Sequence, residues 1–335
     1  MFQEPLKKKT LKELALLIEN AGKIVITCHV KPDGDAVGST LALWHVLGQL
    51  GKDVYVVTPD VPPAYLKFLP GFREITPYSQ NADFAEELIK EANIIFCLDF
   101  NAAYRVDRME QALIEAKGKK IMIDHHLDPE NFVDIIVSMP QDSSTCYLLF
   151  KVICQLGWKP LINKETAGCL AAGMMTDTGN FSYNANDPDI YRAMAELLAT
   201  GIDKVAIWDK LNVKSESQLR LNGYAVEKKL EILGEGMVAV MSLTKEELER
   251  FNYRKGDIEG LVNVPLQIPE VKMSVLMHEE PEFIKVSMRS QGKIAVNEIC
   301  EKYFSGGGHL NAAGGEFRGS MEEAHSKLVE AISTL

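Results

Sequence analysis

The six cysteines of this 335-residue chain form no CxxC pair, and no segment is a long uninterrupted apolar run. The cysteine spacing favours buried, reduced thiols in a reducing compartment. A membrane-spanning helix needs about 20 consecutive apolar residues, so the second absence argues against a membrane protein. The basic residues near the N-terminus precede an apolar stretch interrupted by Lys12, Glu13 and Glu19, which predicts an amphipathic helix and not a signal peptide. We therefore expect a cytoplasmic protein with no membrane partner.

The chain also lacks an excess of positive charge. Its 36 Lys and Arg residues against 47 Asp and Glu residues give a formal net charge of −11. Nonspecific binding to long duplex DNA depends on a basic surface, so this charge argues against such a partner. Nucleotides and short RNA oligonucleotides are compatible with it, because bound metal ions can supply local positive charge. A homodimer is also compatible with the sequence, which leaves the oligomeric state open.

Internal repeats and low-complexity segments are absent, and the composition is that of a globular protein, with 46% apolar and 25% charged residues. In the first half, strand-like apolar runs at residues 23–28, 53–57, 94–98 and 119–123 alternate with helical patterns at residues 36–50, 83–92 and 106–116. This alternation predicts an α/β fold with a parallel sheet and right-handed crossovers.

Helical spacing dominates from residue 143 to about residue 229, and strand-like segments follow at residues 236–243, 271–278 and 283–289. Helical patterns at residues 294–303 and 321–335 complete a second, smaller α/β domain. We predict a parallel-sheet domain at residues 1–191, a helical linker at residues 192–217, and the smaller domain at residues 218–335.

Acidic and imidazole side chains follow the strand-like runs of the first domain. Asp124, His125 and His126 come directly after one apolar run, and Asp99 follows the run before it. The carboxyl ends of parallel strands meet at one edge of a sheet, where α/β proteins bind ligands, so we expect these side chains to converge. The other members of the set follow the first run or lie in a glycine-flanked turn: His29, Asp33, Asp35 and Asp177.

This set of side chains predicts a metal site. Several carboxylates packed together repel one another strongly unless cations lie between them. Aspartate and histidine without cysteine suit Mn²⁺, or alternatively Mg²⁺, better than structural zinc. Two such ions about 4 Å apart can generate a hydroxide and stabilise a displacement at phosphorus. A single aspartate such as Asp35 or Asp177 is more often a helix cap or a turn residue, so the prediction rests on the whole set.

A glycine-rich segment of the second domain gives an independent signal. Gly306, Gly307 and Gly308 precede His309, and consecutive glycines expose backbone N–H groups to an approaching anion. The preceding strand-like run ends at Arg289, whose planar guanidinium suits phosphate. A flexible glycine loop without a ligand is the alternative, but the adjacent histidine and the arginine favour an anion-binding site.

Taken together, these motifs resemble the DHH phosphoesterase superfamily, with a C-terminal part that resembles its DHHA1 domain. The resemblance spans nearly the whole chain and rests on His29-x-x-Pro-Asp33-Gly-Asp35, Asp99, Asp124-His125-His126, Asp177 and Gly306-Gly-Gly-His309. In its two-domain length without further modules, the chain resembles the bifunctional oligoribonuclease (nanoRNase) and pAp phosphatase subfamily. It implies a metal-dependent hydrolase that degrades short oligoribonucleotides to mononucleotides and adenosine 3′,5′-bisphosphate (pAp) to AMP and phosphate, by hydroxide attack at two metal ions.

The resemblance also implies a role for each residue of the metal site. His29, Asp33 and Asp99 would hold one ion, with Asp99 bridging to the other. Asp124 would orient an imidazole, and His126 would contact the scissile phosphate and is the candidate proton donor to the leaving oxygen. The second ion would be held by Asp35, Asp99, His125 and Asp177.

The same resemblance places the active site in a cleft between the two domains. Arg289 and His309 of the smaller domain would hold a substrate phosphate across this cleft. The remaining candidates for substrate binding are Gly306, Gly307, Gly308 and Arg105, with Ser143 or Ser144 as weaker ones.

Other functions stay open at this point. Within the superfamily, the alternative is a phosphodiesterase of cyclic dinucleotides or their linear products; inorganic pyrophosphatases use a similar metal site, but the glycine-rich segment and Arg289 favour a nucleotide-type second domain. From another class, the chain could be a non-catalytic nucleotide-binding regulator, against which its complete set of ligands argues. A structural interaction protein gives no reason to gather so many carboxylates.

Overall fold

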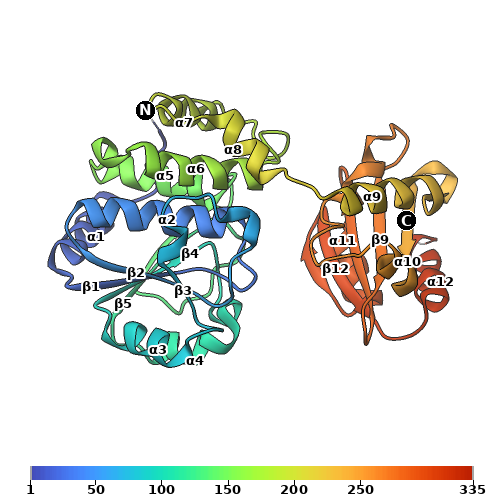
Figure 1. The fold of residues 1–335 in the computed structure, drawn as a ribbon, viewed down its shortest axis with the longest axis horizontal. Coiled ribbons are helices and arrows are strands. Elements are labelled where there is room, and N and C mark those ends of the chain that lie inside the picture. The colour runs from blue at the N-terminus through green and yellow to red at the C-terminus, as the bar shows by residue number, and fades with distance from the viewer. Residues whose placement is uncertain (1, 334–335) are drawn as a thin grey trace. The chain divides into compact units, whose positions relative to one another are not determined.

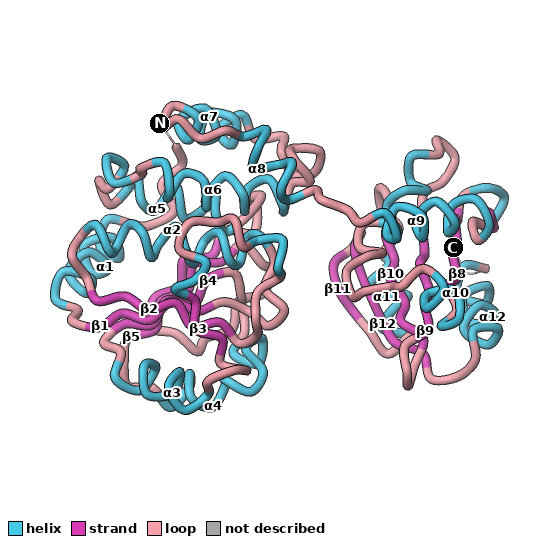
Figure 2. Tube along the Cα trace, viewed as in Figure 1, coloured by secondary structure: helices cyan, strands magenta, loops and turns pink. Residues whose placement is uncertain are grey.

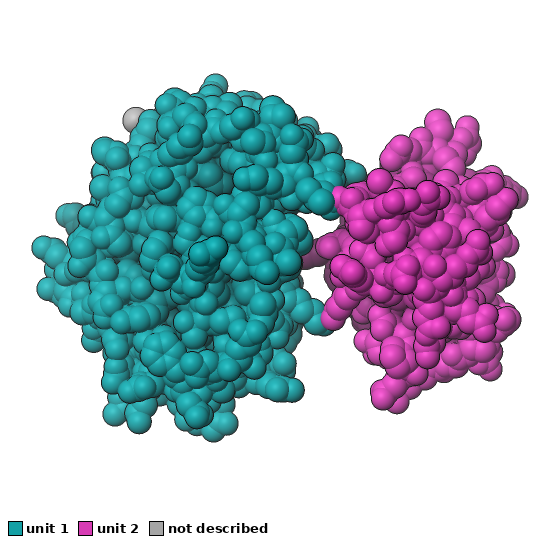
Figure 3. All heavy atoms as spheres, in the orientation of Figure 1, with its two compact units in different colours: residues 1–213 teal, residues 214–335 magenta. Residues whose placement is uncertain are grey.

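The computed structural model of the chain describes residues 2–333 and contains two compact units, Met1–Val213 and Lys214–Leu335 (Figure 3). The division lies within the range expected as a linker, and Ala193, Met194 and Leu197 of that range pack in the core of unit 1. The domain boundaries given above, and a cleft between the domains, stay predictions. In the part of the chain that is described, no helix is both long enough and apolar enough to span a membrane.

Unit 1 is built on a six-stranded parallel sheet with the order β3-β2-β1-β4-β5-β6. The order reverses at β1, so β1 and β4 are neighbours although β2 and β3 lie between them in the sequence. The strands are rich in apolar residues because both faces of such a sheet are covered. Their bounds are β1 (Lys23–Thr27), β2 (Asp53–Thr58), β3 (Ile75–Pro77), β4 (Ile94–Leu98), β5 (Lys119–Asp124) and β6 (Ile135–Ser138).

Helices cover both faces of this sheet, with α1, α2, α5 and α6 on one face and α3 and α4 on the other (Figure 1). Ile24 and Ile26 of β1 pack in the core of the first face and Val25 in that of the second, because successive strand side chains alternate. The bounds are α1 (Lys8–Asn20), α2 (Gly34–Gln49), α3 (Ala82–Glu91), α4 (Glu110–Glu115), α5 (Thr145–Gln155), α6 (Lys164–Asp177), α7 (Pro188–Leu198) and α8 (Lys204–Leu211), with short 3₁₀ helices η1 (Ala64–Leu66), η2 (Phe72–Glu74), η3 (Ala103–Met109) and η4 (Lys159–Leu161).

Helices α2, α5 and α6 approach one another closely where glycines lie at their contacts. A Cβ atom on Gly38 of α2 would lie 2.6 Å from the carbonyl oxygen of Cys169 in α6. A Cβ atom on Gly173 of α6 would lie 2.2 Å from Sγ of Cys146 in α5. Only glycine permits these approaches, and they bring the N-terminal ends of α2 and α5 together with the C-terminal end of α6.

Unit 2 has a mixed sheet with the order β11-β12-β10-β9-β8-β7, in which β8 and β9 are parallel and the other pairs antiparallel. Helices α11 and α12 pack on one face, and α9, α10 and η6 on the other. The bounds are α9 (Glu216–Lys228), β7 (Glu231–Leu233), η5 (Gly234–Gly236), β8 (Val238–Leu243), α10 (Lys245–Arg250), η6 (Leu261–Gln267), β9 (Met273–Glu279), β10 (Ile284–Ser290), α11 (Val296–Tyr303), β11 (Gly307–His309), β12 (Ala312–Phe317) and α12 (Met321–Ile332).

The predicted α/β class with a parallel first sheet is confirmed, and two local details differ from the sequence patterns. The helix expected at residues 106–116 is interrupted, because Asp107, inside η3 and three residues before α4 begins, has a φ of 48°. The glycine-rich segment is not a free loop: it forms the β11–β12 hairpin, in which Gly307 pairs with Gly314 (Figure 2). The two sides of the hairpin approach so closely that a Cβ atom on Gly306 would lie 2.1 Å from the carbonyl oxygen of Gly314, which only glycine permits.

Candidate metal centre

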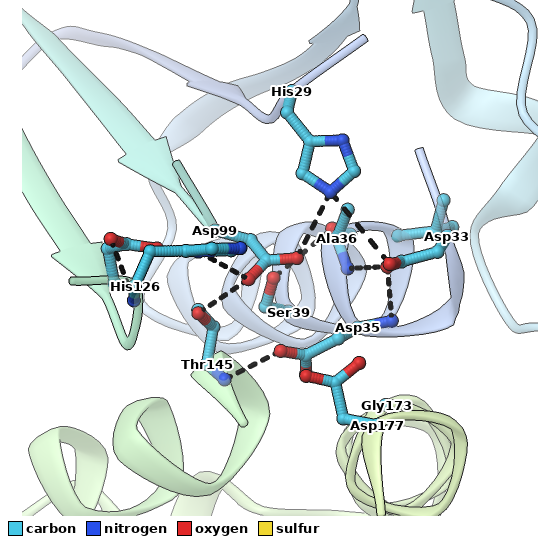
Figure 4. A network of polar contacts seen from close by, with 12 residues as sticks. His29, Asp33, Asp35, Ala36, Ser39, Asp99, His126, Thr145, Gly173 and Asp177 are labelled. Atoms are coloured by element: carbon cyan, nitrogen blue, oxygen red, sulfur yellow. Dashed lines mark hydrogen bonds and ion pairs between the residues drawn. The ribbon is translucent and has the colours of Figure 1, made fainter. Parts of the chain in front are cut away.

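The predicted acidic and imidazole residues of unit 1 converge at the carboxyl edge of the parallel sheet (Figure 4). His29 follows β1 and Asp99 follows β4, the two neighbouring strands at which the strand order reverses. Ligands of open α/β sheets bind at this kind of reversal. Asp35 lies in the first turn of α2, and Asp177 is the last residue of α6, not a turn residue as expected.

The first potential ligand group consists of His29, Asp33 and Asp99. Nε2 of His29 lies 3.3 Å from Oδ2 of Asp99 and 4.0 Å from Oδ2 of Asp33. Nδ1 of the same imidazole lies 2.7 Å from the carbonyl oxygen of Val30. That carbonyl can only accept a hydrogen bond, so Nδ1 keeps its proton in both charge states of the ring, and Nε2 is the nitrogen that a cation would occupy in place of a proton.

The second group consists of Asp35, His125 and Asp177. Nε2 of His125 lies 3.2 Å from Oδ2 of Asp177 and 3.7 Å from Oδ1 of Asp99. Nδ1 of His125 donates to the carbonyl oxygen of Asp142 at 3.1 Å, which again leaves Nε2 toward the carboxylates. Asp99 thus has Oδ2 beside the first group and Oδ1 beside the second, the arrangement that a bridging carboxylate requires. Oxygen and imidazole donors without thiolate fit Mn²⁺ or Mg²⁺.

Asp124 contacts the second histidine of its motif. Its Oδ1 lies 2.7 Å from Nδ1 of His126, and its Oδ2 accepts from the backbone N–H of that residue at 3.1 Å. The Asp124 side chain is fully buried. A buried carboxylate in this position fixes the orientation of the His126 ring, which also lies within ligand distance of Asp99 and His125.

The N-terminal end of α5 supplies contacts that the sequence patterns did not reveal. The Thr145 hydroxyl donates to Oδ1 of Asp99 at 2.9 Å. The backbone N–H groups of Thr145 and Cys146 donate to the two oxygens of Asp35, at 2.6 and 2.9 Å. Ser144, a weaker candidate from the sequence, instead caps α5 by accepting from the N–H of Tyr147. The only signal of these contacts in the sequence was the position of Ser144 at the start of a helix. The N–H groups in the first turn after a helix cap have no partner within the helix and attract carboxylates.

The pKa values of the clustered side chains are shifted by burial and by the many charges close to one another. Burial opposes charge on both imidazoles, but hydrogen bonds to carboxylates and the negative charges of the neighbouring aspartates together outweigh it and raise the pKa of His29 to about 9 and that of His125 to about 11. Burial, with the charges of Asp177 and Asp99, raises the pKa of Asp35 well above its ordinary value. Burial also raises the pKa of Asp177 to about 6. Protons therefore balance the clustered carboxylates, and divalent cations would compete for the same positions.

Arg289 and His309 lie near each other in unit 2. Both are in register with Ala312 of β12, Arg289 from β10 and His309 from β11. Residues in register point to the same face of a sheet, and the two outer strands are about 10 Å apart. Gly307 and Gly308 belong to the same hairpin. In unit 1, the carbonyl oxygen of Arg105 accepts from the N–H of Val30, which places η3 beside the segment that carries His29.

Comparison with known proteins agrees with this architecture. The DHH family, N-terminal domain, matches residues 23–174, and the DHHA1 domain matches residues 235–335. The bifunctional oligoribonuclease and PAP phosphatase NrnA of Thermus thermophilus is 31% identical over 97% of this chain and 93% of its own length. The cyclic-di-AMP phosphodiesterase GdpP of Bacillus subtilis is 27% identical over 96% of this chain but only 49% of its own length.

A solved structure extends this likeness. The crystal structure of an exopolyphosphatase-related protein from Bacteroides fragilis is 46% identical, with a TM-score of 0.97 over 99% of this chain and 98% of that one. Sequence and fold therefore agree over almost the full length. The chain belongs to the DHH phosphoesterase family, with a DHHA1 domain after its N-terminal domain.

Proposed function

We propose that this phosphoesterase hydrolyses short oligoribonucleotides to mononucleotides and pAp to AMP and phosphate. The observation that carries the proposal is the pair of ligand groups that share Asp99, whose two oxygens face His29 and His125 separately. The similarity to a bifunctional oligoribonuclease and PAP phosphatase over 97% of the chain supports the choice of substrates.

Two divalent cations, with Mn²⁺ preferred over Mg²⁺, would supply a hydroxide nucleophile and neutralise charge that develops at phosphorus. His29 and Asp33 would hold the first, and Asp35, His125 and Asp177 the second, with Asp99 shared. Hydrogen bonds within the protein itself hold these side chains in position. Backbone carbonyls fix both imidazoles, and the N-terminal end of α5 orients Asp35 and Asp99.

His126 is the proposed general acid. Its Nδ1 donates to buried Asp124, so that the ring keeps one orientation; in the imidazolium form its Nε2–H would pass its proton to the leaving oxygen and leave the neutral ring on Asp124. Arg289, His309 and the glycines at positions 306–308 are the proposed phosphate-binding residues of unit 2. Guanidinium and imidazole groups donate to phosphate oxygens, as do free backbone N–H groups. The N–H of Gly306 already donates to the carbonyl oxygen of Cys300, so this glycine would contribute only by allowing close approach. Arg105 is a further candidate in unit 1.

One assay tests this function. Purified protein with Mn²⁺ is offered pAp, an RNA dinucleotide, cyclic di-AMP and pyrophosphate in parallel, with a chelator as control. We expect turnover of pAp and the dinucleotide, its loss with the chelator, and its loss in Asp99→Asn but not in Asp83→Asn, which alters an exposed aspartate at the start of α3. Wild-type activity in Asp99→Asn would contradict the shared-carboxylate arrangement.

The second candidate is a cyclic-dinucleotide phosphodiesterase, which the similarity to GdpP favours. Faster cleavage of cyclic di-AMP than of pAp and the dinucleotide would select it. Turnover of none of the four compounds would instead support a nucleotide-binding regulator.

A further inference from the structure

A buried ion pair lies behind the metal centre and has no part in the chemistry described so far. Nζ of Lys151 in α5 lies 2.7 Å from Oδ1 of Asp142, and the two side chains are 1% and 3% exposed. The ammonium group also lies 4.8 Å from the centre of the Tyr147 ring. Asp142 belongs to the segment between β6 and α5, which contains no helix or strand.

Stability alone does not account for this pair. Removing two charges from water costs several kcal/mol per ion, and apolar replacements of buried ion pairs are often neutral or stabilising. The second carboxylate oxygen of Asp142 is buried and, within residues 2–333, has no hydrogen-bond partner. An unsatisfied buried oxygen lowers the net contribution of the pair further.

The backbone of Asp142 connects the pair to the metal centre. Its carbonyl oxygen is the acceptor for Nδ1 of His125. Because the segment around it is irregular, the position of this carbonyl depends on where the Asp142 side chain is anchored. Lys151 anchors it to α5, whose first residues also hold Asp35 and Asp99. One helix thereby positions three of the proposed ligands.

We propose that Lys151 and Asp142 are positioning residues of the metal centre. The ion pair holds the Asp142 carbonyl against Nδ1–H of His125, and so directs Nε2 toward the position of the second cation. The inference rests on the proposed function, since it requires a cation at His125. Partners that orient a metal-binding histidine typically change metal affinity by about 10–100-fold when removed.

The test compares Mn²⁺ binding with folding stability. Lys151→Met leaves a buried carboxylate without its partner, whereas the double variant Asp142→Asn with Lys151→Met removes both charges at similar volume. Lys120→Met is the matched control, because Lys120 is also buried but lies toward the opposite end of β5 and donates to the carbonyl of Ala116. Calorimetric Mn²⁺ titration gives affinity, and urea unfolding of the metal-free protein gives stability.

We expect the double variant to unfold near the wild-type midpoint but to bind one Mn²⁺ about 10–100-fold more weakly, and Lys120→Met to bind as wild type does. Lys151→Arg, which keeps the charge, should retain more affinity than Lys151→Met. If the double variant regains both stability and wild-type affinity, the pair is structural only and the inference is wrong. If the wild type itself binds no Mn²⁺, the proposed function fails first, which is a distinguishable result.

Discussion

Substitution of Gly173 by alanine should damage the metal centre through helix packing, without replacing a proposed ligand. The added Cβ atom would lie 2.7 Å from Oδ1 and 3.0 Å from Cα of Asp35, and 2.2 Å from Sγ of Cys146. Real Cβ contacts are longer, so α2 or α5 must shift. Both helices hold Asp35 in place, since Asp35 belongs to α2 and the N–H of Cys146 binds its carboxylate.

The size of the effect can be set against a glycine of the same helix. Gly168 also lies in α6, but nothing lies within 4 Å of a Cβ atom added there. Gly168→Ala should therefore gain the helix propensity of alanine, about 1 kcal/mol. Gly173→Ala gains the same propensity but adds overpacking, which costs about 1–3 kcal/mol. The two variants should thus differ by about 1–3 kcal/mol in free energy of unfolding, with Gly173→Ala the less stable.

Urea unfolding of the metal-free protein measures this difference, and Mn²⁺ titration of the same samples measures the centre. We expect Gly173→Ala to bind Mn²⁺ more weakly than wild type and Gly168→Ala to bind it equally well. The reasoning is refuted if Gly173→Ala is stabilised like Gly168→Ala and binds Mn²⁺ with wild-type affinity, because the contact between α2 and α6 would then not position Asp35.

Three further predictions concern other parts of the chain. Thr145→Val removes the hydrogen bond to Asp99, and since bonds to charged groups contribute about 1.5–3 kcal/mol, kcat/KM for pAp should fall about 10–100-fold. Arg289→Ala should raise KM for pAp while Mn²⁺ titration stays unchanged, because unit 2 holds none of the proposed metal ligands. Burial lowers the pKa of His278, so the unfolded chain takes up a proton at a higher pH than the folded protein does. The urea midpoint of unfolding should therefore fall as the pH drops below about 6.5, and it should depend less on pH in His278→Phe.

The parallel sheet and the convergence of its strand-end residues could be predicted because they depend on local patterns. Apolar runs mark buried strands, and the residues after them necessarily lie at one edge. Which strands are neighbours could not be read this way, since no local signal places β4 beside β1. The role of Thr145 could not be predicted for the same reason. Its contacts with Asp99 and Asp35 join residues far apart in the sequence, and only the packing of α5 against α2 creates them.

Similar limits apply to the Asp124-His125-His126 motif. The sequence indicated that Asp124 orients an imidazole but not which one, because adjacent residues at a strand end can point in different directions. Asp124 binds His126, whereas His125 depends on the Asp142 carbonyl from a separate segment. The glycine-rich segment likewise had a composition typical of a flexible loop, and its hairpin form follows only from its pairing with β12.

The proposed ligands extend from His29 to Asp177, which affects how the protein matures during synthesis. A nascent chain that has not yet emerged from the ribosome as far as Asp177 lacks part of the second ligand group. Pairing of parallel strands brings distant residues together and is slow compared with helix formation. A complete second ligand group therefore exists only after α6 has been synthesised and packed, so we expect binding of the second cation to follow folding of this part of unit 1.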